Sequence, residues 1–314
     1  MKLWEDLMTG LSARILGLGI VCFGLGLALT FHLIAAVDPD NNSTVMESDH
    51  ALVAALAKAD NASTTKFLYG DFFWTNWAGE TLTRDKFLRS SPKPPLGDES
   101  DTKVSEYTYD QVAEVRVDGG QTRILRVWVK NPSGWKLLAF HEVRLADHPP
   151  ASGGPSANDC VVPCQSVPYE PKDEAERGVF ASWAGLELAL TTHNTEAWVP
   201  HFPEEYVMIN SKTPVPITKS DRIKAIRNPA PESNCKTLWS AGRLCQSQLA
   251  ARPVARFFHF GRTVVIISED TPFVGKPQHD TRIWHPDPKT GIYQMMESWS
   301  STIQSAPTAV PPKL

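Results

Sequence analysis

The sequence predicts two tandem α+β domains behind an N-terminal transmembrane helix. An uncharged apolar run near the N-terminus predicts the membrane helix, and an order of helix first and strands afterwards predicts the α+β class. The same order recurs after a proline-rich stretch, which predicts a second domain. The chain has 314 residues, a length typical of about two domains.

Composition and motifs exclude several broad classes of protein. Hydrophobic residues make up 42% of the chain, so it can bury folded cores and is not a disordered polymer. The formal net charge of −4 excludes a broad basic surface for nucleic acid. The sequence also lacks glycine-rich phosphate loops and the H-E-x-x-H and G-x-S-x-G motifs. We therefore expect no nucleic-acid partner and no cofactor.

The predicted membrane helix is the run from Ile15 to Val37, which contains no charged residue. At 1.5 Å per residue, about 20 residues cross a hydrocarbon core, so this run is long enough to span. A cleaved signal peptide is the alternative, because Ala35 and Ala36 end the run, although the apolar part of a signal peptide is usually only about 7–15 residues long. Residues 15–37 are accordingly predicted to attach the chain to a membrane.

The distribution of positive charge predicts the orientation. Lys2 and Arg14 precede the apolar run, whereas the first cationic residue after it is Lys58. By the positive-inside rule, the N-terminus stays in the cytoplasm and the rest of the chain is exported. Both the anchor and the signal peptide place residues 38–314 in the periplasm or outside the cell, and a cleaved signal would make the protein secreted.

Cysteine usage agrees with export. Cys22 lies in the apolar run, and four other cysteines can form two disulfides with three connectivities. Local pairing is favoured by the spacing of these four residues, which are Cys160, Cys164, Cys235 and Cys245. A zinc site is the competing hypothesis, but neither pair has the C-x2-C spacing of a typical zinc knuckle, and we expect no metal.

Proline-rich segments divide the chain. The stretch from 147 to 172 is rich in proline and contains a Gly-Gly pair, which is typical of an interdomain linker. The expected organisation is an N-terminus and anchor at 1–37, a first domain at 38–146, this linker, a second domain at 173–303 and a disordered tail at 304–314.

The first domain opens with helical spacing and continues as strands. Apolar residues recur at i, i+3, i+4 and i+7 from Leu52 to Ala59, which predicts a helix. The aromatic segment at 71–79 predicts a strand, and Thr83 is placed to cap a short helix. The rest of the block has strand patterns: a segment with Tyr107 and Tyr109, then VAEVRVDGG, TRILRVWVK and WKLLAFHEVRL.

The second domain repeats this order. Asp173 and Glu176 have the spacing of a capping box, and Val179, Trp183 and Leu186 share one helical face. Strand and helix signals follow in EYVMINS (205–211), ITKSDRIKAI (217–226), RFFHF (256–260), RTVVIIS (262–268), DTRIW (280–284) and YQMMESWS (293–300). The Cys235–Cys245 segment is an insertion between the short helix and the sheet.

Matching triplets strengthen the evidence for a repeat. Arg126-Val127-Trp128 and Arg282-Ile283-Trp284 each precede a loop with proline and glycine, and an aromatic residue, Trp135 or Tyr293, then opens the last strand. The chain is therefore predicted to contain two copies of one module, with the same order of strands in their sheets.

The first module resembles the SnoaL-like branch of the nuclear-transport-factor-2-like (NTF2-like) superfamily, of the DUF4440 type. The opening helix, DFFWTNWAGETLTRDKFL and ILRVWVKNPSGWKLLAFHEV carry the resemblance. The second module departs from it, because Tyr293 replaces the tryptophan of the closing strand and Trp299 stands where His141 would align. The resemblance implies cone-shaped domains, in which a curved antiparallel sheet wraps on helices and leaves a pocket at the open end. Members include isomerases, dehydratases, cyclases and binding or assembly modules.

Strand alternation indicates which side chains share a face. Ile124, Arg126 and Trp128 are predicted on one side of their strand, with Leu125, Val127 and Val129 on the other, while Trp135, Leu137, Ala139 and His141 are predicted to lie together. An arginine in the mouth of a cone can bind a carboxylate with both arms. The alternative is that these side chains are packing residues. The pocket candidates are Trp74, Tyr107, Arg126, Trp128, His141, Tyr206, Arg282, Trp284 and Trp299.

Residues for catalysis are less clearly indicated. A proton-shuttling isomerase needs a carboxylate base facing a tyrosine or a protonated acid. Asp71, Tyr107, Tyr109 and Glu297 are of the right type, but no spacing singles one out, so no catalytic residue is assigned.

The functional expectation is a membrane-anchored, exported protein that binds a small molecule or a protein partner without catalysis. An isomerase or dehydratase acting on a small apolar substrate is the alternative. A third hypothesis is a structural role in which the two domains pair through their sheets as an intramolecular pseudo-dimer, or in which the chain forms a homo-oligomer.

Overall fold

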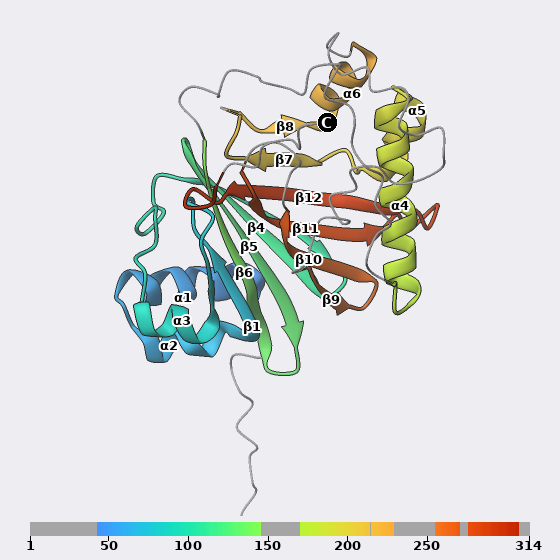
Figure 1. Cartoon of the computed structure of the whole chain (residues 1–314). Helices are drawn as coiled ribbons and strands as arrows, with labels where there is room; N and C mark the ends of the chain where they lie inside the picture. The colour runs from blue at the N-terminus through green and yellow to red at the C-terminus, as the bar shows by residue number, and fades with distance from the viewer. Residues whose placement is uncertain (1–42, 146–169, 214, 229–254, 271–275, 308–314) are drawn as a thin grey trace, which may run out of the picture. The chain divides into compact units, whose positions relative to one another are not determined.

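The computed structural model describes residues 43–145, 170–213, 215–228, 255–270 and 276–307 (Figure 1). The predicted anchor at 15–37 and all five cysteines lie outside the described residues. Among the helices within the described ranges, none is long and apolar enough to cross a membrane.

The first module contains helices α1 to α3 and strands β1 to β6. Its elements are α1 (Val45–Ala57), α2 (Asn61–Phe67), β1 (Leu68–Thr75), β2 (Thr81–Thr83), α3 (Arg84–Ser90), β3 (Lys103–Tyr109), β4 (Val112–Gly119), β5 (Thr122–Asn131) and β6 (Gly134–Arg144). Helix α1 begins earlier than its apolar pattern predicts, because the Thr44 hydroxyl accepts from the Glu47 amide and the Glu47 carboxylate accepts from the Thr44 amide.

The second module has the same kinds of element in nearly the same order. Its elements are α4 (Glu174–Thr191), α5 (Thr195–Trp198), η3 (Val199–His201), β7 (Val207–Asn210), β8 (Ile217–Thr218), α6 (Lys219–Arg227), β9 (Arg256–Phe260), β10 (Thr263–Asp270), β11 (Gln278–Pro286) and β12 (Tyr293–Thr302). Asp173 caps α4 by accepting from the Glu176 amide, as predicted, while the Glu176 carboxylate accepts from the Lys172 amide rather than completing the predicted capping box. The sequence pattern missed α2, α5 and η3, which are short and polar.

Both sheets have one topology. The strand order is β2-β1-β6-β5-β4-β3 in the first module and β8-β7-β12-β11-β10-β9 in the second, and each number in the second list is six higher. In both, the first long strand runs parallel to the last, and the remaining neighbours are antiparallel. The predicted α+β class and the predicted internal repeat are confirmed.

A bulge recurs at the same place in both closing strands. In the first module the register shifts between Val127 and Trp128, so that Leu138 is left without a partner on β5. In the second it shifts between Ile283 and Trp284, which leaves Met296 in the same position. A shared irregularity of this kind supports the repeat at the level of single residues.

Each sheet has two buried faces. One face packs on the helices of its own module, in clusters that contain Trp128 and Trp284 respectively. The other faces meet each other in a third cluster, drawn from Phe73, Tyr109, Val112, Leu125, Val127, Val129, Leu138, Ala139, Val143 and Leu145 in the first module and Ile209, Val265, Ile267, Ile283, Met296 and Trp299 in the second. This arrangement leaves the side chains of β5 and β11 facing either a helix layer or the other sheet.

Candidate functional site

The charged centre of the first module is Arg126, which β5 directs toward the helices. As predicted, alternation along β5 puts Ile124 and Trp128 on the same side, in the cluster under α1. Arg126 is fully buried, and its Nε and Nη2 donate to the two carboxylate oxygens of Asp49, both at 2.7 Å. Trp128 Nε1 donates to the same carboxylate at 2.9 Å. Asp49 therefore ties α1 to two neighbouring positions of the sheet.

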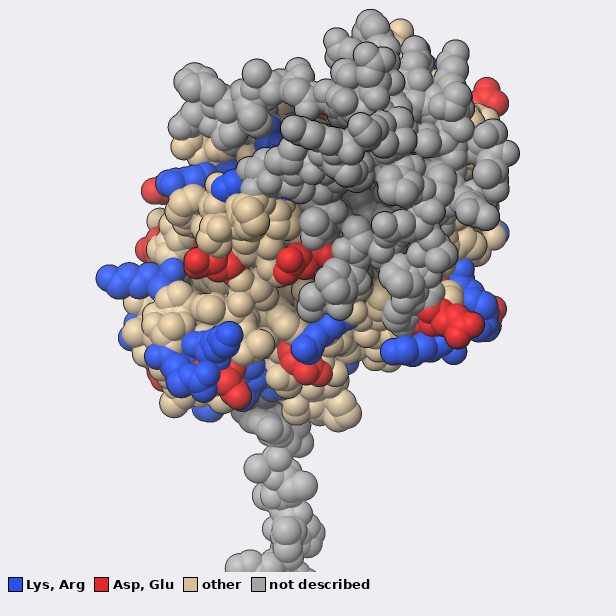
Figure 2. Space-filling model, viewed as in Figure 1, with Lys and Arg blue, Asp and Glu red and all other residues tan. Residues whose placement is uncertain are grey.

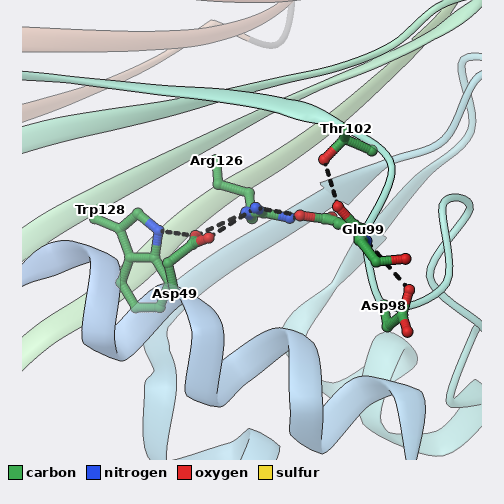
Figure 3. A network of polar contacts seen from close by, with 7 residues as sticks. Asp49, Asp98, Glu99, Thr102, Arg126 and Trp128 are labelled. Carbon is green, nitrogen blue, oxygen red and sulfur yellow. Dashed lines mark hydrogen bonds and ion pairs between the residues drawn. The ribbon is translucent and has the colours of Figure 1, made fainter.

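A second carboxylate completes the ring of acceptors around Arg126. Glu99 accepts from Nη1 at 2.5 Å and from Nη2 at 2.8 Å. Figure 3 shows the guanidinium between Asp49, which projects from α1, and Glu99, which projects from the segment between α3 and β3. Two bidentate carboxylates accept from four of the five N–H donors of the guanidinium, so in this arrangement Arg126 is held by its own chain.

Aromatic side chains fill the space beside this network. The Trp74 ring stacks on Phe140 with centroids 3.8 Å apart and on Phe87 at 4.9 Å. The guanidinium carbon of Arg126 lies 5.8 Å from the Phe140 ring centroid. Trp135 is buried in the same cluster. Trp74 and Trp135 thus pack within this cluster, and Trp128 packs there and also donates to Asp49.

The equivalent centre of the second module is built differently. Arg282 and Trp284 face the helices as Arg126 and Trp128 do, but the helix presents Trp183 to them. Trp183 stacks on Trp284 with centroids 5.4 Å apart, and the guanidinium carbon of Arg282 lies 5.2 Å from the Trp183 ring centroid. The Asp280 carboxylate is 3.4 Å from Arg282 Nη1. Trp183 therefore contacts both residues of this centre, as Asp49 does in the first module.

Two indole donors in this second centre are buried without a hydrogen-bond acceptor among the described residues. They are Nε1 of Trp284 and Nε1 of Trp198. Tyr206 lies in the same cluster and packs against Phe202, with ring centroids 4.4 Å apart. Burial raises the pKa of Tyr206.

His141 does not join the Arg126 centre, and the prediction that it shares a face with Trp135 is wrong. The bulge at Leu138 shifts the alternation by one residue, so that Ala139 and His141 face the second sheet while Trp135 faces the helices. His141 Nδ1 lies 2.9 Å from the Thr281 hydroxyl and Nε2 lies 3.1 Å from that of Ser301. Burial lowers the pKa of His141 to about 3, so the ring is neutral.

A buried charged cluster between the sheets gathers several of the remaining candidates. Arg116 Nη2 pairs with Glu114 at 2.6 Å and also with Glu297, which accepts from Trp299 Nε1. The Tyr109 hydroxyl donates to Glu114 at 3.0 Å. The Arg116 guanidinium carbon lies 4.1 Å from the centroid of the Tyr107 ring. Residues from both modules thus form one polar cluster.

The two carboxyl groups of this cluster have displaced pKa values. Burial raises the pKa of Glu114 to about 7 and raises that of Glu297 well above its ordinary value, and in Glu297 the charge of Glu114 adds to the effect. Burial also raises the pKa of Tyr109. Both carboxylates are fully buried, which seals them between the sheets. The cluster has the residue types of a proton-transfer site but the location of an interface contact.

Two other polar groups of interest are more accessible, although Glu176 in one of them is buried. Asp71 is exposed and stands 3.9 Å from Arg256 across the modules. In the second module, Asp173 and Glu176 each approach one ring nitrogen of His259 at 3.0 Å, and these three side chains are the set within the described residues whose ligand atoms are close enough to hold a metal ion. On the face that Figure 2 shows, acidic and basic side chains are interspersed.

Sequence reasoning missed the partners that decide the role of each arginine. Asp49 interrupts the apolar face of α1 between Val45 and Leu52, and a charge at that position could have indicated a buried ion pair. Glu99 and Glu114 carry no such signal, because the first lies in a loop and the second alternates with apolar residues on a strand that is buried on both faces.

Comparison with known proteins gives structural matches alone. No protein-family model matches the sequence, and no curated protein matches it. An NTF2-like protein from Cytophaga hutchinsonii is 18% identical and covers 32% of this chain and 95% of its own, with a TM-score of 0.25. An NTF2-like protein of unknown function in nutrient uptake from Rhodospirillum rubrum is 20% identical and covers 33% of this chain and 100% of its own, with a TM-score of 0.26.

A further solved structure covers more of the chain. A cystatin-like fold protein from Burkholderia xenovorans is 14% identical and covers 45% of this chain and 96% of its own, with a TM-score of 0.29. Solved proteins described as NTF2-like are thus among the structures to which this chain is similar, and its two six-stranded sheets are consistent with two tandem domains.

Proposed function

We propose that this protein is a membrane-anchored, exported binding or assembly protein made of two SnoaL-like modules that pair through their sheets. The anchor is residues 15–37, and the modules lie outside the cytoplasm. The observation that carries the proposal is the third core cluster, in which the two sheets cover each other and one module supplies Arg116 to Glu297 of the other. Two modules that cover each other in this way are the arrangement expected of a scaffold protein.

The polar contacts between the sheets favour one pairing. Arg116 of the first module reaches Glu297 of the second, and His141 of the first reaches Thr281 and Ser301 of the second. Buried polar partners of this kind can select one arrangement over others, because any other leaves buried groups unpaired. The interface therefore supports one defined pairing of the two sheets.

An isomerase or dehydratase is the alternative function, and Tyr109, Glu114 and Glu297 are its nearest candidates. A raised pKa on a carboxyl group beside a tyrosine is typical of proton-transfer sites. These groups instead lie in the packed layer between two sheets, where a substrate would have to displace core residues. Their position favours the assembly role.

A complementation experiment separates the two functions. Tyr109→Phe, Glu114→Gln and Glu297→Gln remove the acid-base groups but keep the volume of each side chain. If the chain is an assembly protein, the triply substituted chain should restore the phenotype of a deletion strain as the unsubstituted chain does. A folded variant that fails to restore it would support the enzyme.

Topology is tested independently of the modules. Protease added to spheroplasts should digest residues beyond 38 and leave the N-terminus protected, because the positive residues Lys2 and Arg14 precede the anchor. Mass spectrometry without reductant should find Cys160, Cys164, Cys235 and Cys245 unavailable to alkylation. Full protection from protease would contradict export, and complete labelling of all four thiols would contradict the disulfides.

A further inference from the structure

The carboxylate of Glu99 is bound in the first module as a ligand would be. Arg126 receives two carboxylates of different origin, one from a helix and one from an irregular segment. We propose that the Arg126 centre is a binding site for an external monocarboxylate, which takes the place of Glu99 when the α3–β3 segment lifts away. This inference names a ligand class and rests on the binding function proposed above.

The fixed half of the site is made by Asp49, Arg126 and Trp128. All three are almost completely buried, and they sit on α1 and β5, the regular elements of the module. Asp49 is held by three donors, two from Arg126 and one from Trp128. These contacts remain in place if Glu99 leaves, so the outer edge of the guanidinium stays aimed at the position of the Glu99 carboxylate.

The removable half of the site is the segment from 91 to 102, which connects α3 to β3. Around Glu99 the segment holds itself by local contacts: the Glu99 amide donates to the Leu96 carbonyl at 3.1 Å, and the Thr102 hydroxyl donates to the Glu99 carbonyl at 2.7 Å. Its apolar attachment is Leu96, which packs on the core cluster and against Gly119. Lifting the segment breaks the contacts of Glu99 and the packing of Leu96, while Ser91, at the start of the segment, can remain hydrogen-bonded to Asn61 as the hinge end.

The backbone of Glu99 also favours release. Glu99 has φ of 61°, in the left-handed region that residues other than glycine adopt at a cost. The segment therefore holds Glu99 in place against a conformational preference, and the two bonds to Arg126 must offset that cost. An external carboxylate carries no such constraint.

Charge and shape define the class of ligand. One guanidinium already faces two carboxylates, and both burial and the charge of Glu99 raise the pKa of Asp49. Replacing Glu99 with a monocarboxylate leaves this balance unchanged, whereas a dianion adds a negative charge to a buried site. A planar carboxylate fits the planar fork of arginine, and Phe140 beside it offers apolar contact.

The first test removes the Glu99 carboxylate from the Arg126 centre. The full chain carrying Glu99→Ala is melted in increasing sodium acetate or sodium formate, with sodium chloride at equal ionic strength as the reference. We expect the variant to melt lower than the unsubstituted chain and to regain several degrees with carboxylate, in a saturable way that chloride does not reproduce. Glu106→Ala, which removes an exposed glutamate of β3, is the matched control and should show no carboxylate-specific gain.

The second test asks whether a ligand displaces Glu99 in the unsubstituted chain. Hydrogen exchange at residues 91–102 should speed up as acetate is raised well above the concentrations that saturate the variant, because acetate must compete with the tethered Glu99, while exchange in α1 stays constant. Unchanged exchange there would make Glu99 a permanent structural partner and would overturn the proposal, as would a Glu99→Ala variant that responds equally to acetate and chloride. If Glu99→Ala does not fold, the exchange measurement alone decides.

These results are separable from the proposed assembly function. If the acetate tests fail but the protease and complementation tests succeed, the ligand site is contradicted and the scaffold function stands. If the acetate tests succeed but the protease test fails, the ligand site stands and the exported location is contradicted.

Discussion

Trp183 takes in the second module the place that Asp49 has in the first. Asp49 contacts Arg126 and Trp128 through hydrogen bonds, and Trp183 contacts their counterparts through stacking. Each residue comes from the first long helix of its module and faces the same two positions of the sheet. The two modules thus share a topology, but different side chains of the first long helix contact the equivalent arginine: a carboxylate in the first module and an indole ring in the second.

The first prediction concerns the carboxylate of Asp49. Asp49→Asn should destabilise the chain by roughly 3–5 kcal/mol, because it removes one charge of a buried ion pair and leaves the donors of Arg126 poorly matched. Urea unfolding monitored by tryptophan fluorescence measures the loss. His50→Ala, at the next position on α1 but exposed, should change stability by less than about 0.5 kcal/mol. A similar small loss in both variants would mean that the ion pair does not stabilise the module.

The fold could be predicted because its signals are local and repeated. Apolar spacing marked the cores of α1 and α4, and turn residues marked the hairpins of both sheets. The triplets at Arg126 and Arg282 fixed the alignment between modules, and the common bulges bear it out. Short polar helices such as α2 and α5 were missed, because they are stabilised by caps and tertiary packing and have no apolar stripe.

The site could be predicted only in part, because its geometry depends on residues far apart in sequence. Alternation placed Arg126 and Trp128 on the correct face, but it could not reveal that Asp49 and Glu99 fill the site. For His141 the prediction failed because one extra residue at a bulge inverts every later side chain in the strand. Bulges of this kind leave no signal in a pattern of period two.

The second prediction concerns the pH dependence of the cluster between the sheets. Burial raises the pKa of Glu297 well above 4.5, so the folded chain binds more protons than the unfolded chain as pH rises past that value. Stability from this group therefore falls as pH rises. Glu297→Gln cannot ionise, so its stability relative to the unsubstituted chain should improve by roughly 1–3 kcal/mol between pH 5 and pH 8.

The comparison uses the free energy of unfolding of both chains at each pH, because shared groups such as Glu142 then cancel. Glu106→Gln, at an exposed site, should follow the unsubstituted chain at every pH. Parallel curves for Glu297→Gln and the unsubstituted chain would show that Glu297 is not held in a desolvated cluster.

The third prediction concerns His141, whose effect has the opposite sign. Burial lowers the pKa of the folded-state ring to about 3, so the unfolded chain binds the extra proton between about pH 3 and pH 6.5. Stability is then lost as pH falls through this window. His141→Gln can hydrogen-bond to Thr281 and Ser301 without titrating. We compare its free energy of unfolding with that of the unsubstituted chain at each pH. This difference should favour the variant by about 2 kcal/mol more at pH 5 than at pH 7.5.

Urea midpoints at the two pH values measure this gain. The control is His50→Gln, which lies exposed on α1 and should show the same difference from the unsubstituted chain at pH 5 and pH 7.5. An equal difference for His141→Gln at both pH values would mean that the ring is accessible to protons in the folded chain.

The last prediction concerns the contact between the turn that joins β1 to β2 and the end of β12. The amide of Gln304 donates to the carbonyl of Ala78 at 2.9 Å, which draws the chain after β12 against Gly79. A Cβ on Gly79 would lie 2.6 Å from the Thr302 carbonyl oxygen. Gly79→Ala should therefore force the backbones apart. Gly120→Ala is a matched control, because Gly79 and Gly120 have φ of 76° and 82°, but a Cβ at 120 meets nothing within 4 Å.

Both alanine variants incur the cost of a left-handed backbone, about 1–2 kcal/mol. The difference between their free energies of unfolding isolates the close approach, and we expect Gly79→Ala to lose at least about 2 kcal/mol more, since the neighbour is backbone and cannot rotate away. Equal losses would mean that the end of β12 does not rest on this turn. A larger loss for Gly79→Ala would show that the second module is seated on the first through backbone contacts as well as through the layer between the sheets.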